Sequence, residues 1–307
     1  MPDRFQLTAG AAGLAADQAN RMGSDPGFIA ALDQSGGSTP KALALYGIDE
    51  SGYANDDEMF DVVHAMRTRI MTDPAFDGER ILGTILFQNT LDRAVNGVPT
   101  SQYLWREKRI LPILKIDYGM DDVEDGAQTM KAIPDLGDRL PAARAKDVFG
   151  TKMRSVIQGA NAAGIARVVD QQFEIAREVI GHGLVPIIEP EVDIHAPDKA
   201  ACEEILRDRL QAGADALDDG VVMFKLTLPE QANFYSDLCA HTKVLRVVAL
   251  SGGYSREVAN ERLAANNGMI ASFSRALTEG LRVDLDAAAF GGLLDESIAS
   301  IAAASNT

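Results

Sequence analysis

Eight short apolar runs recur along the chain, and most of them are separated by amphipathic stretches of helical length. They occupy residues 28–33, 81–87, 111–116, 151–157, 184–189, 221–227, 245–251 and 269–273. Continuous aliphatic and β-branched runs of this length are typical of strands buried on both faces, as in a parallel sheet. Alternation of strands and helices over the whole length predicts an α/β fold, and eight repeats favour closure into a (β/α)8 TIM barrel.

The segments between these runs are mostly helical in pattern. Residues 56–72 carry apolar side chains at helical spacing, and residues 161–181 and 198–212 have the same character. The connections 34–80 and 117–150 are long enough for further helices or loops at the rim. We therefore expect one barrel domain over residues 1–307, with extra N-terminal and rim helices. A doubly wound open sheet remains the alternative.

Composition and charge restrict the class of partner. The chain is 46% hydrophobic and 24% charged, which is ordinary for a soluble domain, and its net charge of −16 disfavours nucleic acid and anionic membranes. No continuous apolar stretch reaches eighteen residues, and the first thirty lack the layout of a signal peptide. Cys202 and Cys239 are too few for a disulfide framework, so we expect free thiols and a cytoplasmic protein.

Charged residues stand where barrel strands should be apolar. A single charge in a strand is usually a solvated residue at the rim, but here six of the eight runs contain or precede one. Barrel active sites form at the carboxyl ends of the strands, and buried charges must neutralise one another. Such a constellation usually indicates chemistry. The residues are Asp33, Lys115, Lys152 with Arg154, Glu189 with Glu191, Lys225 and Arg275.

A lysine among carboxylates can serve as a nucleophile. The free amine is almost fully protonated at neutral pH, but desolvation and a neighbouring cation expose its lone pair. Lys225 has the most apolar neighbours in sequence, and Lys152 is a plausible second cation. The sequence alone leaves Lys115, Lys152 and Lys225 open as candidates, with Lys225 preferred.

Two glycine-rich turns indicate anion binding. Ser251-Gly252-Gly253 follows the seventh run and leads into a predicted helix over 255–265, while Arg275 follows the eighth run. Backbone N–H groups at such a turn approach phosphate closely, and the loops after strands seven and eight are a common phosphate site in barrels. The turn within 33–38 is a second candidate, with a flexible capping loop as its plain alternative.

Patterns for metal or nucleotide chemistry are missing. The four histidines show neither an HExxH pattern nor close pairing, and neither a Walker A nor a GxGxxG motif occurs. We therefore expect no metal and no cofactor.

Eight motifs in order resemble the class I fructose-1,6-bisphosphate aldolases, in their shorter bacterial form. The resemblance covers about residues 28–277. The motifs are ALDQSGGS (31–38), GTILFQNTLDR (83–93), LKIDYG (114–119), TKMRSVI (151–157), IIEPEVDIH (187–195), MFKLTLP (223–229), ALSGGYS (249–255) and ASFSRAL (271–277).

The resemblance implies a role for each matching catalytic residue. Lys225 would form a Schiff base with the ketose C2, and Lys152 would help to keep that amine neutral. Glu189 would be the general acid and base of imine formation, and Glu191 would hold the lysines and balance their charge. Asp33 would take the C4 hydroxyl proton as the C3–C4 bond breaks.

The resemblance also implies the substrate contacts. Ser251, Gly252 and Arg275 match a site for the C1 phosphate, and Ser35 and Ser38 match contacts to the other phosphate. Lys115 would lie beside the catalytic aspartate. We add Gly253, from the same turn, and Arg154, which shares a strand face with Lys152.

Three departures from the animal-type pattern stand out. Those enzymes end in a tyrosine that assists proton exchange, whereas this chain has no tyrosine after Tyr254. Ser274 replaces a glycine, and Gln34 replaces a glutamate.

The predicted activity is reversible cleavage of fructose 1,6-bisphosphate to dihydroxyacetone phosphate and glyceraldehyde 3-phosphate, in glycolysis or gluconeogenesis. Relatives are often homo-oligomers, so self-association is an expected partnership. One rival is another Schiff-base sugar aldolase or a transaldolase, and a second is a non-catalytic barrel that binds phosphosugars.

Overall fold

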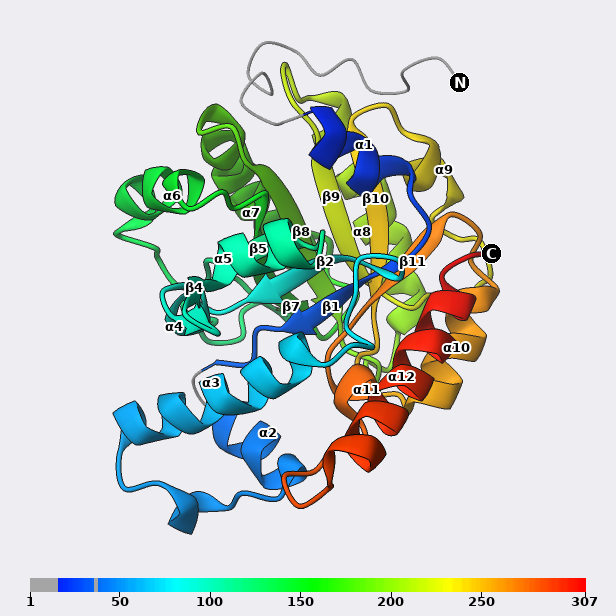
Figure 1. Ribbon diagram of the computed structural model, residues 1–307. Coiled ribbons are helices and arrows are strands. Elements are labelled where there is room, and N and C mark those ends of the chain that lie inside the picture. The colour runs from blue at the N-terminus through cyan, green and yellow to red at the C-terminus, as the bar shows by residue number, and fades with distance from the viewer. Residues whose placement is uncertain (1–15, 36–37) are drawn as a thin grey trace.

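The computed structural model describes residues 16–35 and 38–307 and contains a closed barrel (Figure 1). Its eight parallel strands follow one another in chain order around the barrel, and β5 pairs with β7 where the short β6 intervenes in sequence. The β1–β11 pairing completes the circle. The strands are β1 Phe28–Leu32, β2 Ile81–Leu86, β5 Leu111–Lys115, β7 Gly150–Ile157, β8 Val185–Val192, β9 Val222–Thr227, β10 Val244–Leu250 and β11 Met269–Phe273.

This architecture confirms the predicted (β/α)8 barrel, because closure rules out an open doubly wound sheet. Every predicted run overlaps one strand. The largest difference is in β8, which continues three residues beyond the predicted end at Glu189 because it stays paired with β7 as far as Ile157–Val192. Glu189 and Glu191 therefore lie on one extended strand and share a face.

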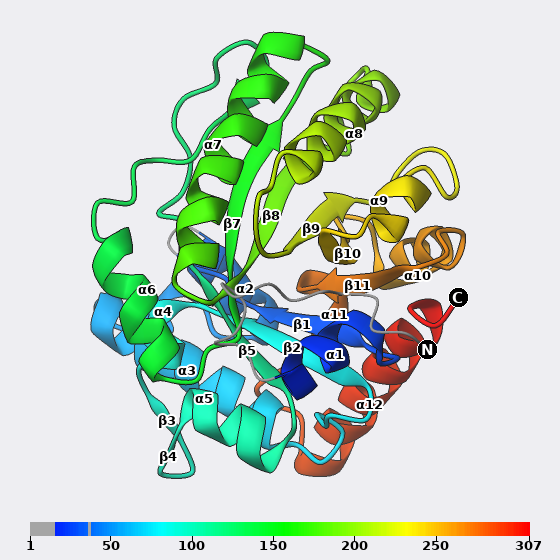
Figure 2. The same cartoon turned by 90° about the horizontal axis from the view of Figure 1, so that it is seen from above.

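Long helices cover the outside of the barrel, as the view from above shows (Figure 2). Helix α3 spans Asp56–Thr72, as predicted, and begins where the side chain of Asn55 accepts a hydrogen bond from Glu58 N–H. The other predicted helices differ by one to three residues at their ends: α7 is Ala162–Gly181, α8 is Lys199–Asp215 and α10 is Arg256–Ala264.

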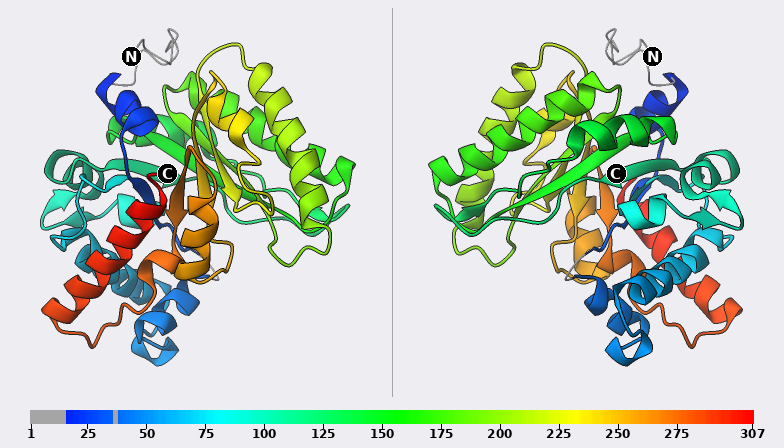
Figure 3. Two further views of the ribbon diagram at one scale, coloured as in Figure 1. Left: turned by 90° about the vertical axis from the view of Figure 1, so that its right-hand side faces the viewer. Right: turned by 90° about the vertical axis from the view of Figure 1, so that its left-hand side faces the viewer.

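The two long connections contain additional elements, as expected. Residues 34–80 contain α2 Ser38–Tyr46 and η2 Glu50–Gly52 besides α3, and residues 117–150 contain β6 Ala127–Gln128 and α6 Leu136–Ala145. The remaining elements are α1 Ala16–Ser24, α4 Gln88–Leu91, β3 Ala94–Val95, β4 Val98–Pro99, α5 Thr100–Gln102, η3 Tyr103–Glu107, α9 Ser236–Ala240, α11 Arg275–Thr278 and α12 Ala287–Ala304. Figure 3 shows α1 at one end of the barrel, opposite α2.

Two separate apolar clusters form the core. The larger lies between the strands and the outer helices, and the smaller fills the barrel interior together with Met22 of α1. Strand β9 alternates between them: Val222 and Phe224 belong to the outer cluster, and Met223 belongs to the inner one. Lys225 therefore faces the barrel interior one layer above Met223. The apolar interior ends where the charged layer begins.

Helix α12 is, among the described residues, the one helix long and apolar enough to cross a membrane by length and composition. It packs against α10, α11 and β11 and buries Phe290, Leu294 and Ile298. A helix that covers a protein core meets the same criteria. Cys202 is buried and Cys239 is half-buried, and neither forms a disulfide bond among the described residues.

Two helical glycines offer a matched test of this packing. A Cβ added at Gly213 of α8 would lie 2.2 Å from Cε2 of Phe173, whereas one added at Gly292 of α12 would meet no atom within 4 Å. We predict that Gly213→Ala lowers the free energy of unfolding by about 1–3 kcal/mol through overpacking. Gly292→Ala should raise it by roughly 0.5–1 kcal/mol because alanine is the better helix former. Urea denaturation measures both, and equal shifts in the two variants would contradict the packing.

Candidate active site

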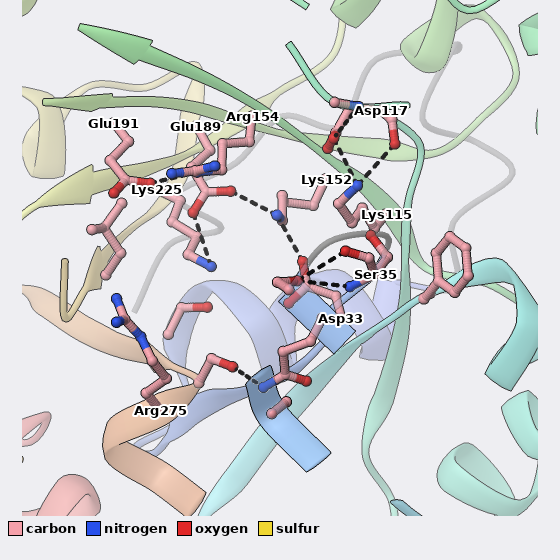
Figure 4. Close-up of a pocket in the computed structure, with 18 of the residues that line it drawn as sticks. Asp33, Ser35, Lys115, Asp117, Lys152, Arg154, Glu189, Glu191, Lys225 and Arg275 are labelled. Carbon is pink, nitrogen blue, oxygen red and sulfur yellow. Dashed lines mark hydrogen bonds and ion pairs between the residues drawn. The ribbon is translucent and has the colours of Figure 1, made fainter. Parts of the chain in front are cut away.

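A cavity of about 700 Å3 opens at the carboxyl ends of the barrel strands (Figure 4). Twelve of the thirteen predicted site residues line it, and Gly253 does not. Basic side chains outnumber acidic ones in its wall, although the chain as a whole is strongly acidic. The lining residues are Asp33, Gln34, Ser35, Ser38, Lys41, Ala42, Leu45, Phe87, Lys115, Asp117, Tyr118, Gly119, Met120, Lys152, Arg154, Glu189, Glu191, Lys225, Leu250, Ser251, Gly252, Ser272, Ser274 and Arg275.

Lys152 is the centre of a buried charge network. From β7 its Nζ lies 2.7 Å from Asp33 Oδ2, directly after β1, and 2.8 Å from Glu189 Oε2 on β8. All three side chains are at most one-tenth exposed. One ammonium group thus holds two carboxylates from opposite directions.

Lys225 joins the same network from β9. Its Nζ lies 3.1 Å from Glu189 Oε1, and its side chain is 5% exposed. Glu189 therefore lies between two lysines, with one carboxylate oxygen toward each. Its Oε2 is buried and has no aligned hydrogen-bond donor among the described residues, so this oxygen can still accept a hydrogen bond.

The network sets the protonation states of its members. Burial alone would raise the pKa of Asp33, but the ammonium groups, Lys152 first, outweigh burial and hold that pKa well below its usual range. The pKa of Glu189 is lowered in the same way against its own burial. Burial opposes the charge of Lys152, yet the two carboxylates raise its pKa above the ordinary value. At neutral pH the site therefore contains two carboxylates and an ammonium at Lys152.

Arg154 and Glu191 form a second ion pair nearer the mouth. Nε of Arg154 lies 2.5 Å from Glu191 Oε2, and the pair stays partly exposed. Burial disfavours the guanidinium charge, but the carboxylate raises the pKa of Arg154 above its usual value. The sequence analysis expected Glu191 to hold the lysines, whereas its ion pair among the described residues is with the arginine that stands two residues after Lys152 on β7. In the strand register Arg154 lies beside Glu189, so the Lys152–Glu189 and Arg154–Glu191 contacts each reach two residues further along β8.

Lys115 is paired with a residue that the sequence analysis did not single out. Its Nζ lies 2.7 Å from Asp117 Oδ1 and 2.8 Å from the carbonyl oxygen of the same residue. Asp117 is buried, and Lys115 contributes to the low pKa of Asp33 through its charge. The pair fixes the end of β5 at the cavity wall.

One end of the cavity carries the predicted phosphate turn. Ser251 is buried, and Gly252 and Gly253 both have positive φ, 61° and 118°, which L side chains rarely adopt. A Cβ on Gly252 would also lie 2.7 Å from Ile194 Cγ2. Arg275 follows β11, and a Cβ added at Gly253 would lie 3.7 Å from its Nη2, so the guanidinium stands beside this turn.

The second predicted anion site lies at the start of α2. The Ser35 N–H donates to Ser38 Oγ at 3.1 Å, which caps the turn, and both residues line the cavity. Gly36 and Gly37, in the same predicted turn, lie outside the described residues. Lys41, one helical turn after Ser38, also lines the cavity.

The residues missed by sequence reasoning had usable signals. Lys41 stands three residues after Ser38, so the two share a helix face. Ser272 stands two residues after Ile270 of the inner cluster on β11, so it faces the interior as well. Asp117 comes directly after the charge-bearing end of β5. Among the described residues no cluster of three or more histidine, cysteine or acidic side chains is arranged to hold a metal ion.

A sequence profile of the family described as fructose-bisphosphate aldolase class-I matches residues 15–234. The fructose-bisphosphate aldolase class 1 of Synechocystis sp. is 58% identical over 95% of this chain and 97% of its own length. The chain belongs to the class I fructose-bisphosphate aldolases. The class 1 enzyme of Clostridium acetobutylicum is 55% identical over 94% of this chain and 99% of its own length, and that of Porphyromonas gingivalis is 52% identical over 94% and 98%.

Solved structures of more distant aldolases support the fold. The Plasmodium falciparum fructose-bisphosphate aldolase, solved with TRAP and a small-molecule inhibitor, superposes with a TM-score of 0.76 at 23% identity, covering 97% of this chain and 96% of that one. An aldolase from Slackia heliotrinireducens gives a TM-score of 0.52 at 12% identity, covering 93% of each chain. Class I aldolases are enzymes that act without a metal, through a lysine Schiff base, and the predicted family is therefore confirmed.

The buried network predicts a pH-dependent stability defect when its cation is removed. With Lys152→Met, we expect the free energy of unfolding to fall by about 3–5 kcal/mol near pH 7.5, because Asp33 loses its direct partner. In the parent protein both carboxylates have lowered pKa values, so their contribution is present above about pH 4 and lost below it. In the variant, burial raises those pKa values, so the defect should shrink as the pH approaches 5.

Urea denaturation at several pH values measures this effect. Lys146→Met is the matched control, because Lys146 forms an exposed ion pair with Asp92, and it should change stability by less than about 1 kcal/mol at any pH. A Lys152→Met defect that does not vary with pH would argue against the network as the cause.

Proposed function

We propose that Lys225 is the nucleophile that forms the Schiff base with the ketone carbon of fructose 1,6-bisphosphate. The observation that carries this proposal is the 3.1 Å approach of Lys225 Nζ to Glu189 inside a cavity with an anion-binding turn at one end. Lys152 is less suited, because two carboxylates hold its proton. Lys115 is held by Asp117 in the same way.

Imine formation requires that one proton leave the amine and later reach the departing water. Glu189 is a carboxylate close to Lys225, so it can take that proton and free the lone pair for attack on C2. A second proton moves from nitrogen to oxygen in the resulting carbinolamine. Glu189 then returns its proton to the C2 hydroxyl, which leaves as water, and the positively charged iminium remains. No proton is gained or lost overall.

The iminium then acts as the electron sink for carbon–carbon cleavage. Asp33 is a carboxylate at the end of β1, and it would accept the C4 hydroxyl proton as the C3–C4 bond breaks and its electrons move to the nitrogen. Glyceraldehyde 3-phosphate leaves first. Protonation at C3 and hydrolysis of the imine release dihydroxyacetone phosphate and restore Lys225.

Charge in the cavity supports a doubly phosphorylated substrate. Ser251, Gly252 and Arg275 would hold the C1 phosphate, and Ser35, Ser38 and Lys41 stand on the β1–α2 side for the other. Because basic residues outnumber acidic ones in the lining, the cavity can attract an anion that the acidic surface repels.

The proposed chemistry also bears on the cofactor, the partners and the compartment of the protein. The iminium supplies the electron sink, so we propose that no metal or other cofactor takes part. We also propose that the chain is one catalytic domain in the cytoplasm, with phosphorylated ketoses rather than nucleic acids or membranes as partners, and that copies of it self-associate.

Borohydride reduction in the presence of dihydroxyacetone phosphate tests the nucleophile. Trypsin cuts the unmodified chain after Arg209, Lys225 and Lys243, whereas an adduct on Lys225 blocks the middle cut. We expect one adduct-bearing peptide, 210–243, in mass spectrometry. An adduct on a peptide of Lys115 or Lys152, or activity abolished by a chelator, would overturn the assignment.

Substitution of the nucleophile should separate folding from activity. Lys225→Met should lower kcat by about 10⁴-fold or more, because the covalent route is lost, while circular dichroism shows a folded protein. The exposed-lysine variant Lys146→Met should keep normal turnover. Ordinary turnover by Lys225→Met would remove the lysine from its proposed role.

Asp33 should matter for cleavage and much less for imine formation. Asp33→Ala should slow cleavage of fructose 1,6-bisphosphate by about 10²–10⁴-fold, the range for a lost general base. The yield of the borohydride-trapped peptide with dihydroxyacetone phosphate should stay close to normal. If both fall together, Asp33 serves the network rather than the cleaved bond.

A transaldolase or another Schiff-base aldolase would share the lysine without needing two phosphate sites. Comparing kcat/KM for fructose 1,6-bisphosphate and fructose 1-phosphate distinguishes these readings. Equal values would count against the site near Ser35 and Ser38.

A further inference from the structure

The carboxyl ends of β1 and β11 are joined by a hydrogen bond at the cavity wall. Gln34 Nε2 donates to Ser274 Oγ, and both residues line the cavity. Ser274 directly precedes Arg275 and lies two residues beyond Ser272 on the interior face.

Arg67 fixes the direction of this hydrogen bond. Its guanidinium is 1% exposed and reaches the β1 end from α3, with Nη2 at 2.6 Å from the Gln34 carbonyl oxygen and 3.5 Å from Gln34 Oε1. Nη1 donates to Thr90 Oγ1 at 2.6 Å. Arginine has donors only, so the oxygen of the Gln34 amide must face Arg67. The amide NH2 group must then face Ser274.

The hydroxyl of Ser274 consequently acts as the acceptor and retains its own hydrogen. No acceptor for that hydrogen is found within residues 16–35 and 38–307. With respect to those residues the hydroxyl therefore has an uncommitted donor in the cavity wall, in the residue next to Arg275. A glutamate at position 34 would reverse this arrangement, because its carboxylate would take the hydrogen and add negative charge.

We propose that Ser274 donates its hydroxyl hydrogen to the phosphate held by Ser251, Gly252 and Arg275, and that Gln34 is the positioning residue that keeps this donor free. The proposal deepens the proposed function, because it concerns the phosphate of the ketose bound at Lys225. According to this proposal, tight binding of the phosphate requires the Gln34 amide, although the amide does not contact the phosphate.

The test measures how much ketose half-saturates imine trapping by borohydride, read from the 210–243 peptide. The two probes are dihydroxyacetone phosphate and dihydroxyacetone, which differ only in the phosphate. Ser274→Ala should raise the half-saturating concentration of dihydroxyacetone phosphate on the order of tenfold, the usual weight of a hydrogen bond to a charged group. Dihydroxyacetone should be unaffected. The maximal yield at saturation should also stay unchanged.

Ser51→Ala is the matched control, because Ser51 is an exposed serine outside the cavity lining. It should leave both probes unchanged. A normal dihydroxyacetone phosphate curve for Ser274→Ala overturns the proposal, and so does an equal shift for both probes, since that indicates a general change of the site. In each case the adduct still forms on Lys225 and the proposed function stands. If the parent protein forms no adduct, the proposed function fails and this inference fails with it.

Combining substitutions at Gln34 and Ser274 tests whether Gln34 acts through Ser274. Gln34→Glu keeps an acceptor for Arg67, so the fold should be retained, but it should weaken dihydroxyacetone phosphate binding by at least about tenfold. Adding Ser274→Ala to Gln34→Glu should change the half-saturating concentration of dihydroxyacetone phosphate by less than about twofold. The reason is that the Ser274 hydroxyl already donates its hydrogen to the carboxylate at position 34. Full additivity of the two substitutions would show that Gln34 does not act through Ser274.

Discussion

The buried ammonium of Lys152 between two carboxylates is the interaction on which the site depends. Asp33 and Glu189 come from opposite sides of it, on elements far apart in sequence, and neither could remain ionised at such depth without a cation. Lys152 thus has two carboxylate partners, whereas the neighbouring Lys225 approaches Glu189 alone among the described residues. This difference in partners is the basis for the different roles that we propose for the two lysines.

The barrel makes this arrangement possible through the alternation of its strands. On β7, β8 and β9, every second residue points inward, so a step of two residues moves from the apolar layer to the charged layer. Met223 closes the interior from below, and Lys225 stands directly above it. Water is thereby kept away from the lower side of the network, and charge–charge interactions there are strengthened.

The sequence predicted the barrel because each buried strand is a continuous apolar run, and it predicted the site because charges interrupt those runs at the same end. It could not predict which charges pair. Glu191 was expected to hold the lysines, yet its ion pair is with Arg154. The strand register could not have predicted this contact, because the β8 residue directly beside Arg154 is Glu189. Asp117 was missed because it lies in a connection without strand or helix periodicity. Lys41 was missed because its helix forms part of an irregular connection, where no strand end marks it.

The apolar layer beneath the charged one has a consequence for protein engineering. Robustness to heat and acceptance of new sugars are usually in conflict, since both depend on the same crowded residues. Here the filling of the lower barrel, which includes Met22 of α1, lies beneath the charged layer that we propose to bind the ketose. Substitutions at the base of the barrel can therefore be chosen for thermal stability, and substitutions around the cavity can be chosen separately for a different aldehyde.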